Sequence, residues 1–171
     1  EIPYTDYTAG EQTVFAVMTA LMHRLRTGQG QFVDISQTQA ASATVPEALL
    51  DFAANGRTEP RIGNSDPGMA PHGCYPCQGE DRWITIAVDS DERWRAFCGV
   101  VNKPDLAEDQ RFKDSLNRWR NRAKLDELIG QITTQWEAHQ LMNQLQAIGV
   151  AAGAVFDSKD LLFDPHLVER G

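Results

Sequence analysis

The hydrophobic pattern opens with apolar residues that recur at three- and four-residue spacing between residues 7 and 26. The residues of this stripe are Val14, Phe15, Val17, Met18, Leu21, Met22 and Leu25. The spacing predicts an amphipathic helix, because 3.6 residues per turn bring these positions to one face. Asp6 would then lie at the start of the helix. Gly28 would end it, since glycine tolerates the left-handed backbone of a C-terminal cap.

A short strand and a second helical segment are predicted next. Phe32, Val33 and Ile35 favour a strand over residues 31–36, and the alanine-rich residues 37–54 favour a helix. Because Pro46 lacks a backbone N–H, this helix should kink or restart there. The order helix, strand, helix is typical of an α/β fold.

The pattern changes between residues 55 and 73, where glycine and proline accumulate and periodicity is lost. This composition predicts a linker and a functional loop. Residues 74–78 and 83–88 then flank a polar turn, which predicts a β-hairpin. Asp89 to Glu92 supply capping side chains for a third helix. Further helices are predicted over 121–136 and 139–148, a strand or extended segment over 150–156, and a short helix over 158–163 that ends at Pro165.

Composition and charge exclude several kinds of protein. Hydrophobic residues make up 42% of the 171 residues and charged residues 23%, as in a folded globular chain. The formal charge of −8 disfavours nucleic acid as a partner, and the basic cluster Arg118, Arg120, Arg122 and Lys124 is interpreted as a solvated helix face. No apolar run approaches the roughly eighteen residues that cross a bilayer, and no signal peptide is evident. We therefore expect a cytoplasmic protein without a membrane partner.

The cysteines give no strong indication of a metal or redox site. Cys74 and Cys77 have CxxC spacing, but a closed zinc site needs four ligands and no second pair follows. A redox pair would place its first cysteine at a helix N-terminus, whereas these residues lie within a predicted strand. With Cys98 the set is odd, which suits a reducing compartment better than a disulfide framework. We predict free thiols and no metal.

Four blocks of sequence are considered together: residues 3–10 (PYTDYTAG), 26–36 (RTGQGQFVDIS), 70–77 (APHGCYPC) and 161–171 (LLFDPHLVERG). In combination they resemble one family, the family III CoA-transferases with their acyl-CoA racemase relatives. Each block alone is common. Their shared order and spacing over nearly the whole chain carry the resemblance.

The resemblance implies an α/β fold with three parts. Residues 1–55 would belong to a Rossmann-like large domain and lead to a linker. Residues 56–150 would form a small α+β domain with a short antiparallel sheet and the active-site loop, and residues 151–171 would be a linker that returns toward the large domain. A longer parent is also implied. The half of it that makes most CoA contacts would precede Glu1, and a C-terminal segment would follow Gly171. The full-length parent is expected to be a dimer.

By the same resemblance, Asp6 is the catalytic nucleophile. It would attack the thioester carbonyl of an acyl-CoA, and CoA would pass to a small carboxylic acid through a covalent aspartyl intermediate. No bound cofactor is implied, because the coenzyme A thioester is itself the substrate. Residues 63–73 match the family's mobile active-site loop, whose backbone N–H groups would stabilise oxyanions. The loop residues singled out are Gly63, Gly68, Met69, Ala70, Pro71 and Gly73.

Alternative interpretations of these residues stay open. On local grounds Asp6 is a helix N-cap, a role compatible with catalysis because the positive end of the helix dipole favours a carboxylate anion. The loop is equally well an inter-domain linker. Tyr7, His72 and Tyr75 could line an acyl pocket, or they could lie at the edge of a core as amphipathic side chains.

Two other functions compete with CoA transfer. An acyl-CoA racemase or epimerase of the same family would exchange an α-proton between the aspartate and a histidine located before Glu1. The run from Asp6 to Gly10 resembles the transferases more than the racemases. A truncated chain without catalytic activity is the remaining alternative, because the groups that hold CoA would lie outside it.

Overall fold

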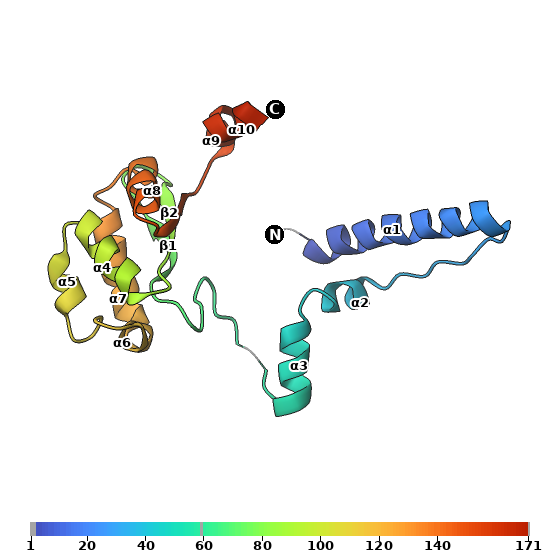
Figure 1. The fold of residues 1–171 in the computed structure, drawn as a ribbon, viewed down its shortest axis with the longest axis horizontal. Coiled ribbons are helices and arrows are strands. Elements are labelled where there is room, and N and C mark those ends of the chain that lie inside the picture. The colour runs from blue at the N-terminus through green and yellow to red at the C-terminus, as the bar shows by residue number, and fades with distance from the viewer. Residues whose placement is uncertain (1–2, 59, 171) are drawn as a thin grey trace. The chain divides into compact units, whose positions relative to one another are not determined.

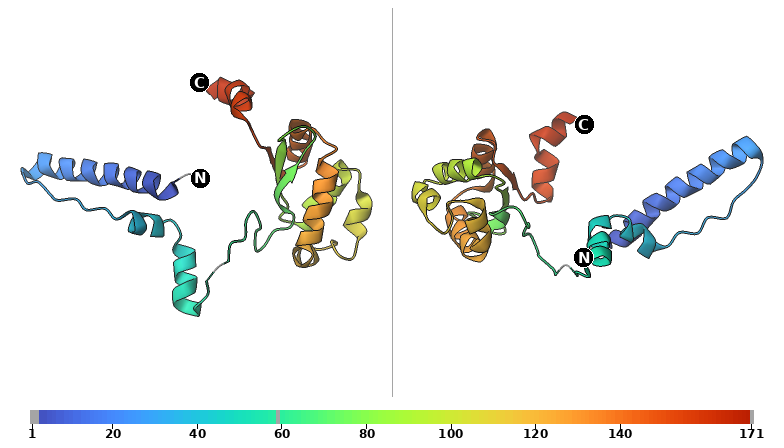
Figure 2. Two further views of the ribbon diagram at one scale, coloured as in Figure 1. Left: turned by 180° about the vertical axis from the view of Figure 1, so that it is seen from behind. Right: turned by 60° about the horizontal axis from the view of Figure 1, so that its bottom comes forward.

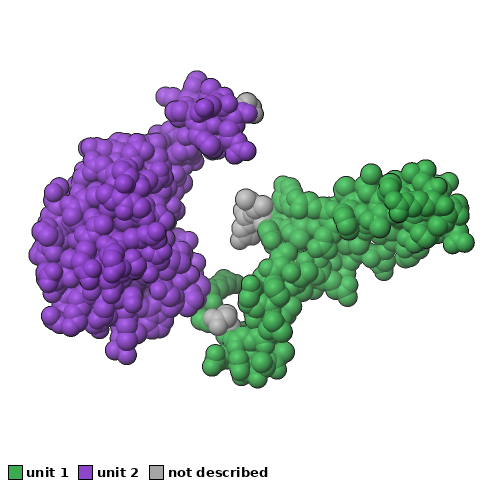
Figure 3. All heavy atoms as spheres, in the orientation of Figure 1, with its two compact units in different colours: residues 1–61 green, residues 62–171 purple. Residues whose placement is uncertain are grey.

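The computed structural model describes residues 3–58 and 60–170 of the chain. Contacts between residues divide the chain into two compact units, residues 1–61 and residues 62–171, which Figure 3 colours separately. Each unit has its own helices, and the strands labelled in Figure 1 belong to the second unit.

Unit 1 is helical. It contains α1 (Tyr4–Thr27), α2 (Gln37–Ser42) and α3 (Pro46–Asn55), and α2 packs against α1. Gly28 ends α1 as predicted, with a left-handed φ of 76° and an N–H that donates to the Arg24 carbonyl. The break predicted at Pro46 is confirmed, because α2 ends at Ser42 and Pro46 opens α3.

The apolar stripe of α1 faces solvent. Among the described side chains of α1, Ala9 alone is buried, whereas Phe15 is 76% exposed and Leu25 is 83% exposed. Most of the stability of a helix in a protein comes from packing such a face against other elements. Unit 1 therefore draws little stability from its own apolar side chains.

The strand predicted over residues 31–36 is wrong for this structure. The segment between α1 and α2 has no strand assignment, and the β-ladders of the described residues lie in unit 2. A strand requires a neighbour that exchanges backbone hydrogen bonds with it, and sequence alternation alone cannot supply one. Residues 30–33 instead lie beside α1, with which they line a hollow of about 330 Å³.

Unit 2 is built on a three-stranded antiparallel sheet in the order β1-β2-β3. Its strands are β1 (His72–Pro76), β2 (Trp83–Ala87) and β3 (Ala151–Ala154). The predicted hairpin is confirmed, with Cys74 opposite Thr85 and with the Cys77 N–H donating to the Arg82 carbonyl across the turn. The expected mixture of helices with a small antiparallel sheet is thus confirmed.

Helices lie on one side of this sheet (Figures 1 and 2). They are α4 (Asp91–Val100), α5 (Pro104–Glu108), α6 (Ser115–Arg120), α7 (Arg122–Thr133) and α8 (Ala138–Ala147). The α7 helix contacts β1, and α8 contacts β2 and β3. Ser90 caps α4 by accepting the Arg93 N–H, close to where the sequence predicted capping. The largest buried side chains are Trp94, Arg118, Phe97, Phe112, Ile84, Ile86, Leu125, Ile129, Leu141, Leu145, Val88 and Val150.

One member of that core corrects the sequence interpretation. Arg118, which we expected on a solvated helix face, is 0% exposed. Spacing along a six-residue helix such as α6 cannot show which side the tertiary structure covers. Arg120, two positions later on the same helix, is exposed as predicted.

Two short helices, α9 (Ser158–Phe163) and α10 (Pro165–Arg170), end the described chain. The predicted α9 begins with a capping box between Asp157 and Asp160. Arg82 of the hairpin contacts both carboxylates, at 3.1 Å and 2.6 Å. The sequence did not predict α10, although Pro165 suits the first position of a helix.

The three-part domain division stays a prediction. The contacts divide the chain after Arg61, and β3 (Ala151–Ala154) completes the sheet of unit 2.

Over the two described ranges, no helix combines the length and the apolar character that crossing a bilayer requires.

Candidate functional site

Asp6 lies in the first turn of α1 with its side chain exposed. The expectation that Asp6 is the N-cap is wrong, because Pro3 occupies that position and Tyr4 already belongs to the helix. Proline, with its fixed φ, suits the entry to a helix. The Asp6 N–H donates to the Pro3 carbonyl at 3.0 Å. The carboxylate nevertheless lies at the positive end of the helix dipole, which favours an anion there.

Gln37 orients the Asp6 carboxylate. Its Nε2 donates to Asp6 Oδ1 at 3.0 Å, although the residues are 31 positions apart. Gln37 is the first residue of α2, whose start is capped by Ser36. Packing of α2 against α1 therefore brings the amide donor to the carboxylate. Sequence reasoning missed Gln37, because no local signal marks a contact between two helices.

The loop of residues 63–73 belongs to unit 2, and Asp66 organises its tip. Asp66 Oδ1 accepts the N–H groups of Gly68 at 2.7 Å and Met69 at 3.0 Å. This is an Asx turn, in which a carboxylate oxygen accepts backbone N–H groups two and three residues further along the chain. Gly63 has a left-handed φ of 60°, which favours glycine there. Sequence reasoning also missed Asp66, although an Asp-Pro-Gly run is a turn signal.

The end of the loop is fixed to the core. Ala70 is 3% exposed, and Pro71 is buried and accepts the Val88 N–H at 2.9 Å. At Gly73 an added Cβ would lie 2.8 Å from the Tyr75 hydroxyl oxygen. The structure thus gives Gly73 a packing role and leaves the tip near Gly68 exposed.

The three aromatic candidates have different surroundings. Tyr7, next to Asp6, is 64% exposed, whereas Tyr75 is 4% exposed. The Tyr75 hydroxyl donates to Asp126 Oδ1 at 2.7 Å. Burial, followed by this bond to Asp126, raises the pKa of Tyr75 far above its ordinary value. Burial also raises the pKa of Asp126. Tyr75 therefore acts as a core-edge residue.

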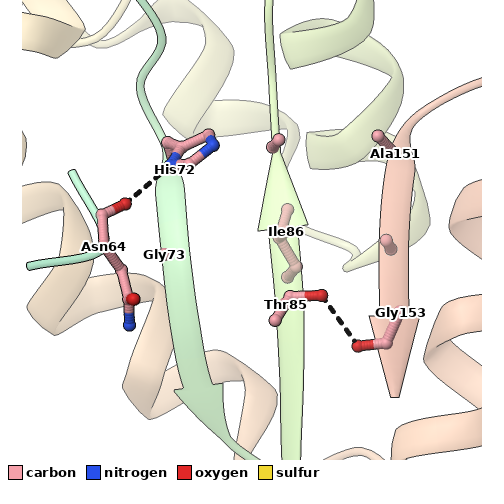
Figure 4. A pocket seen from close by; sticks show the side chains of 9 residues that line it. Asn64, His72, Gly73, Thr85, Ile86, Ala151 and Gly153 are labelled. Atoms are coloured by element: carbon pink, nitrogen blue, oxygen red, sulfur yellow. Dashed lines mark hydrogen bonds between the residues drawn. The ribbon is translucent and has the colours of Figure 1, made fainter. Parts of the chain in front are cut away.

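His72 lies at the rim of a pocket on the outer face of the sheet (Figure 4). Its Nδ1 is 2.6 Å from the Asn64 carbonyl oxygen. Because a carbonyl can only accept, Nδ1 carries the hydrogen, and Nε2 of the neutral ring is an acceptor. Figure 4 shows Nε2 directed away from Asn64 toward β2.

The pocket itself has a volume of about 400 Å³ and a floor of small side chains. Thr85 donates its hydroxyl to the Gly153 carbonyl at 3.0 Å, which fixes one part of the floor. The lining residues are Asn64, His72, Gly73, Thr85, Ile86, Ala87, Ala151, Ala152 and Gly153. This hollow can hold a short carbon chain beside two polar groups, the Asn64 amide and His72 Nε2.

The cysteines have properties of packed thiols. Cys77 and Cys98 are buried and Cys74 is half-buried. Burial raises the pKa of Cys77 to about 11 and of Cys98 to about 12, so both are protonated at neutral pH. Within residues 3–58 and 60–170, no three His, Cys, Asp or Glu side chains form a group that could hold a metal ion.

The candidate residues thus fall into two groups. Asp6 and Gln37 are together in unit 1, and the loop, His72 and the sheet pocket are together in unit 2.

The whole chain is similar to CoA-transferases of one family. The sequence profile of CoA-transferase family III matches residues 1–171. The Mycobacterium tuberculosis protein named "Probable CoA-transferase Rv1866" is 36% identical over 167 residues, which are 98% of this chain and 21% of that protein. The succinyl-CoA–D-citramalate CoA-transferase of Chloroflexus aurantiacus is 32% identical over 165 residues, 96% of this chain and 41% of that enzyme.

A solved structure shows the same fold. The crystal structure of a CaiB/BaiF family protein from Brucella suis matches with a TM-score of 0.90 at 30% identity, over 100% of this chain and 45% of that one. The chain therefore spans less than half the length of each of these three proteins.

Proposed function

Because the chain belongs to CoA-transferase family III, we propose that the complete protein transfers CoA from an acyl-CoA to a carboxylic acid with Asp6 as nucleophile. The observation that carries this proposal is the geometry at Asp6. Its carboxylate is exposed in the first turn of α1, and Gln37 orients one of its oxygens. A carboxylate that is accessible and oriented is equipped for attack on a thioester.

The exchange proceeds through acyl transfers at Asp6. The carboxylate attacks the thioester carbonyl, the C–S bond breaks, and a mixed anhydride and CoA thiolate form. The thiolate then attacks the aspartyl carbonyl, releasing the first acid and leaving an aspartyl-CoA thioester. The incoming carboxylate attacks this thioester and expels the thiolate, which finally attacks the new acyl group and frees Asp6. Covalent catalysis divides one difficult displacement into easier steps.

The loop of residues 63–73 is proposed to supply oxyanion donors. Each tetrahedral intermediate places negative charge on an oxygen that backbone N–H groups can stabilise. The N–H groups of Gly68 and Met69 already converge on one carboxylate oxygen, that of Asp66. This arrangement supports the loop as a place where an anionic oxygen is held.

The acid is proposed to be a short dicarboxylic acid. The Chloroflexus relative is named for succinyl-CoA and D-citramalate, each of which has a carboxylate besides the group that carries or receives CoA. The pocket beside the loop offers the Asn64 amide as a donor and a floor of alanine and glycine.

We further propose that the complete protein is a dimer. Light scattering coupled to size-exclusion chromatography would measure its mass in solution and test this.

Substitution of Asp6 tests the nucleophile. In the complete protein, Asp6→Asn should lower CoA exchange between succinyl-CoA and a panel of short dicarboxylic acids by about a thousandfold or more. Stability should change by less than about 1 kcal/mol, because the exposed side chain does not cap the helix and loses only its favourable interaction with the helix dipole. Glu11→Gln, on the same helix and also exposed, is the matched control and should retain activity.

Trapping locates the intermediate. Borohydride or hydroxylamine added during turnover should modify Asp6, and mass spectrometry identifies the labelled peptide. An Asp6→Asn protein that still exchanges CoA would refute the nucleophile. Exchange of an α-proton without CoA transfer would favour the racemase alternative instead.

A further inference from the structure

Arg118 is a buried cation beneath the candidate loop. It extends from α6 and is 0% exposed. Its guanidinium carbon lies 5.5 Å from the centre of the Trp94 ring, and Nη2 is 2.8 Å from Asp91 Oδ1. Burial of a charge is costly, and an apolar residue of similar size often serves a core equally well. The hydrogen bonds that the guanidinium makes are therefore the reason to look for a role of this buried charge.

The guanidinium holds two carbonyl groups of irregular backbone. Nε donates to the Ala70 carbonyl at 2.8 Å, and Nη1 donates to the Phe112 carbonyl at 3.3 Å. Neither carbonyl lies in a helix or a strand. A buried carbonyl outside regular structure needs another donor, and the fixed fork of arginine can reach both groups from one position.

The Ala70 contact lies between the loop tip, which is held by the loop's own Asp66, and the end of the loop, which is attached to the core. Before it, the tip at Gly68 and Met69 is held by Asp66, a residue of the loop itself. After it, the Pro71 carbonyl accepts the N–H of Val88, the residue that follows β2. Met69, which supplies one of the converging N–H groups, directly precedes Ala70. The N–H groups of Gly68 and Met69 therefore lie directly before the point at which Arg118 attaches the loop to the core.

We propose that Arg118 is a positioning residue for the loop of residues 63–73. Its buried guanidinium fixes the Ala70 carbonyl and thereby the location of the backbone donors at Gly68 and Met69. The inference rests on the proposed function, because those donors matter only if the loop stabilises an oxyanion. Asp91 balances the charge, so that the cation can remain in the core.

Kinetics of the complete protein test this proposal. Arg118→Met removes the donors, and Arg118→Lys keeps the cation but replaces the fixed fork of donors with a single ammonium nitrogen. Displacement of catalytic groups by a fraction of an ångström lowers turnover, so kcat should fall about tenfold or more in Arg118→Met. KM for succinyl-CoA should change less than about threefold, since an interaction used in the transition state is lost. Arg118→Lys should be intermediate.

The matched control is Arg120→Met, because Arg120 lies on the same helix and is exposed. It should leave kcat and KM unchanged. All rates are measured well below the melting temperature of each variant, so that a purely structural role would leave kcat of the folded fraction intact. Wild-type kcat in a folded Arg118→Met or Arg118→Lys protein overturns the proposal. If Arg118→Met does not fold, Arg118→Lys decides.

Hydrogen exchange separates this proposal from the proposed function. Arg118→Lys should increase amide exchange at residues 68–70 while exchange in β2 (Trp83–Ala87) stays as in the wild type. Unchanged exchange at residues 68–70 contradicts the positioning role whatever the enzyme does. If loop exchange responds but Asp6→Asn retains full CoA exchange, the nucleophile fails and the anchoring of the loop stands.

Discussion

Gly73 has no side chain because the Tyr75 phenol occupies that space. A Cβ at Gly73 would lie 2.8 Å from the hydroxyl oxygen and 2.9 Å from the ring carbon that bears it. Gly73→Ala should therefore displace the phenol from Asp126 and lower the free energy of unfolding by about 1–3 kcal/mol. Urea denaturation at pH 7 measures this loss.

Gly68→Ala is the control for that substitution. Its added Cβ would meet Asp66 at 3.6 Å, an ordinary contact, and its φ is not left-handed. The free energy of unfolding should stay within about 0.5 kcal/mol of the wild type. Equal losses in both variants would show that the Tyr75 contact does not explain the need for glycine at position 73.

Asp126 should make stability depend on pH. Burial raises the pKa of Asp126 above its ordinary value of 3.8, although the bond from Tyr75 opposes this shift. A group whose pKa is raised by folding stabilises the fold below its unfolded pKa, and this contribution is lost as pH rises through the folded pKa. The wild type should therefore lose stability relative to Asp126→Asn as pH increases from below 3.8 through the raised pKa.

Urea denaturation of both proteins in steps from pH 3 to pH 7 follows this difference. The Asn variant keeps an acceptor for the Tyr75 hydroxyl and cannot ionise. A difference in unfolding free energy that stays constant over the range would rule out the predicted titration of Asp126.

At the scale of elements, the contact between Arg82 and α9 links the hairpin to the C-terminal helices. Arg82 pairs with Asp157 and Asp160, the two residues of the α9 capping box. Arg82→Ala should increase amide exchange in α9 (Ser158–Phe163), while the pairing of β1 with β2 keeps its protection. Lys159→Ala, an exposed change within α9, should leave exchange unchanged. Equal exchange in both variants would mean that the capping box alone holds α9.

The helices were predictable from sequence wherever local chemistry decides their ends. Gly28, Pro46 and Ser90 mark boundaries through φ, a missing N–H and a capping hydroxyl, and each boundary is found near its predicted place. The strand over residues 31–36 was not predictable, because pairing depends on a distant segment. The prediction of the hairpin at residues 72–87 was confirmed, because its two strands are adjacent in sequence.

At the scale of the whole molecule, the two units differ in what holds them together. The connected core of buried side chains runs from Ala70 to Val150 and lies within unit 2. Residues 62–171 expressed alone should therefore unfold cooperatively in urea. Residues 3–61 alone should show weak helicity by circular dichroism, because the α1 stripe is exposed and isolated helices are marginal in water.

Denaturation of the two fragments checks this difference. A single cooperative transition is expected for residues 62–171 and a gradual, non-cooperative change for residues 3–61. A sharp transition in the smaller fragment would show that packing of α2 against α1 suffices for a stable fold.

The sequence by itself determined the family, the mixture of helices with a small antiparallel sheet, and Asp6 and the loop as candidates. These features depend on residue types at fixed spacing, which local physical chemistry or family resemblance can identify. The tertiary structure alone decided that Gln37 orients Asp6, that Gly73 makes room for Tyr75 and that Arg118 is buried beneath Ala70. The contacts of Gln37 and Arg118 join segments that are distant in sequence, and the contact at Gly73 depends on the rotamer of Tyr75. A linear pattern specifies which face of a helix is apolar, but only packing specifies what that face meets.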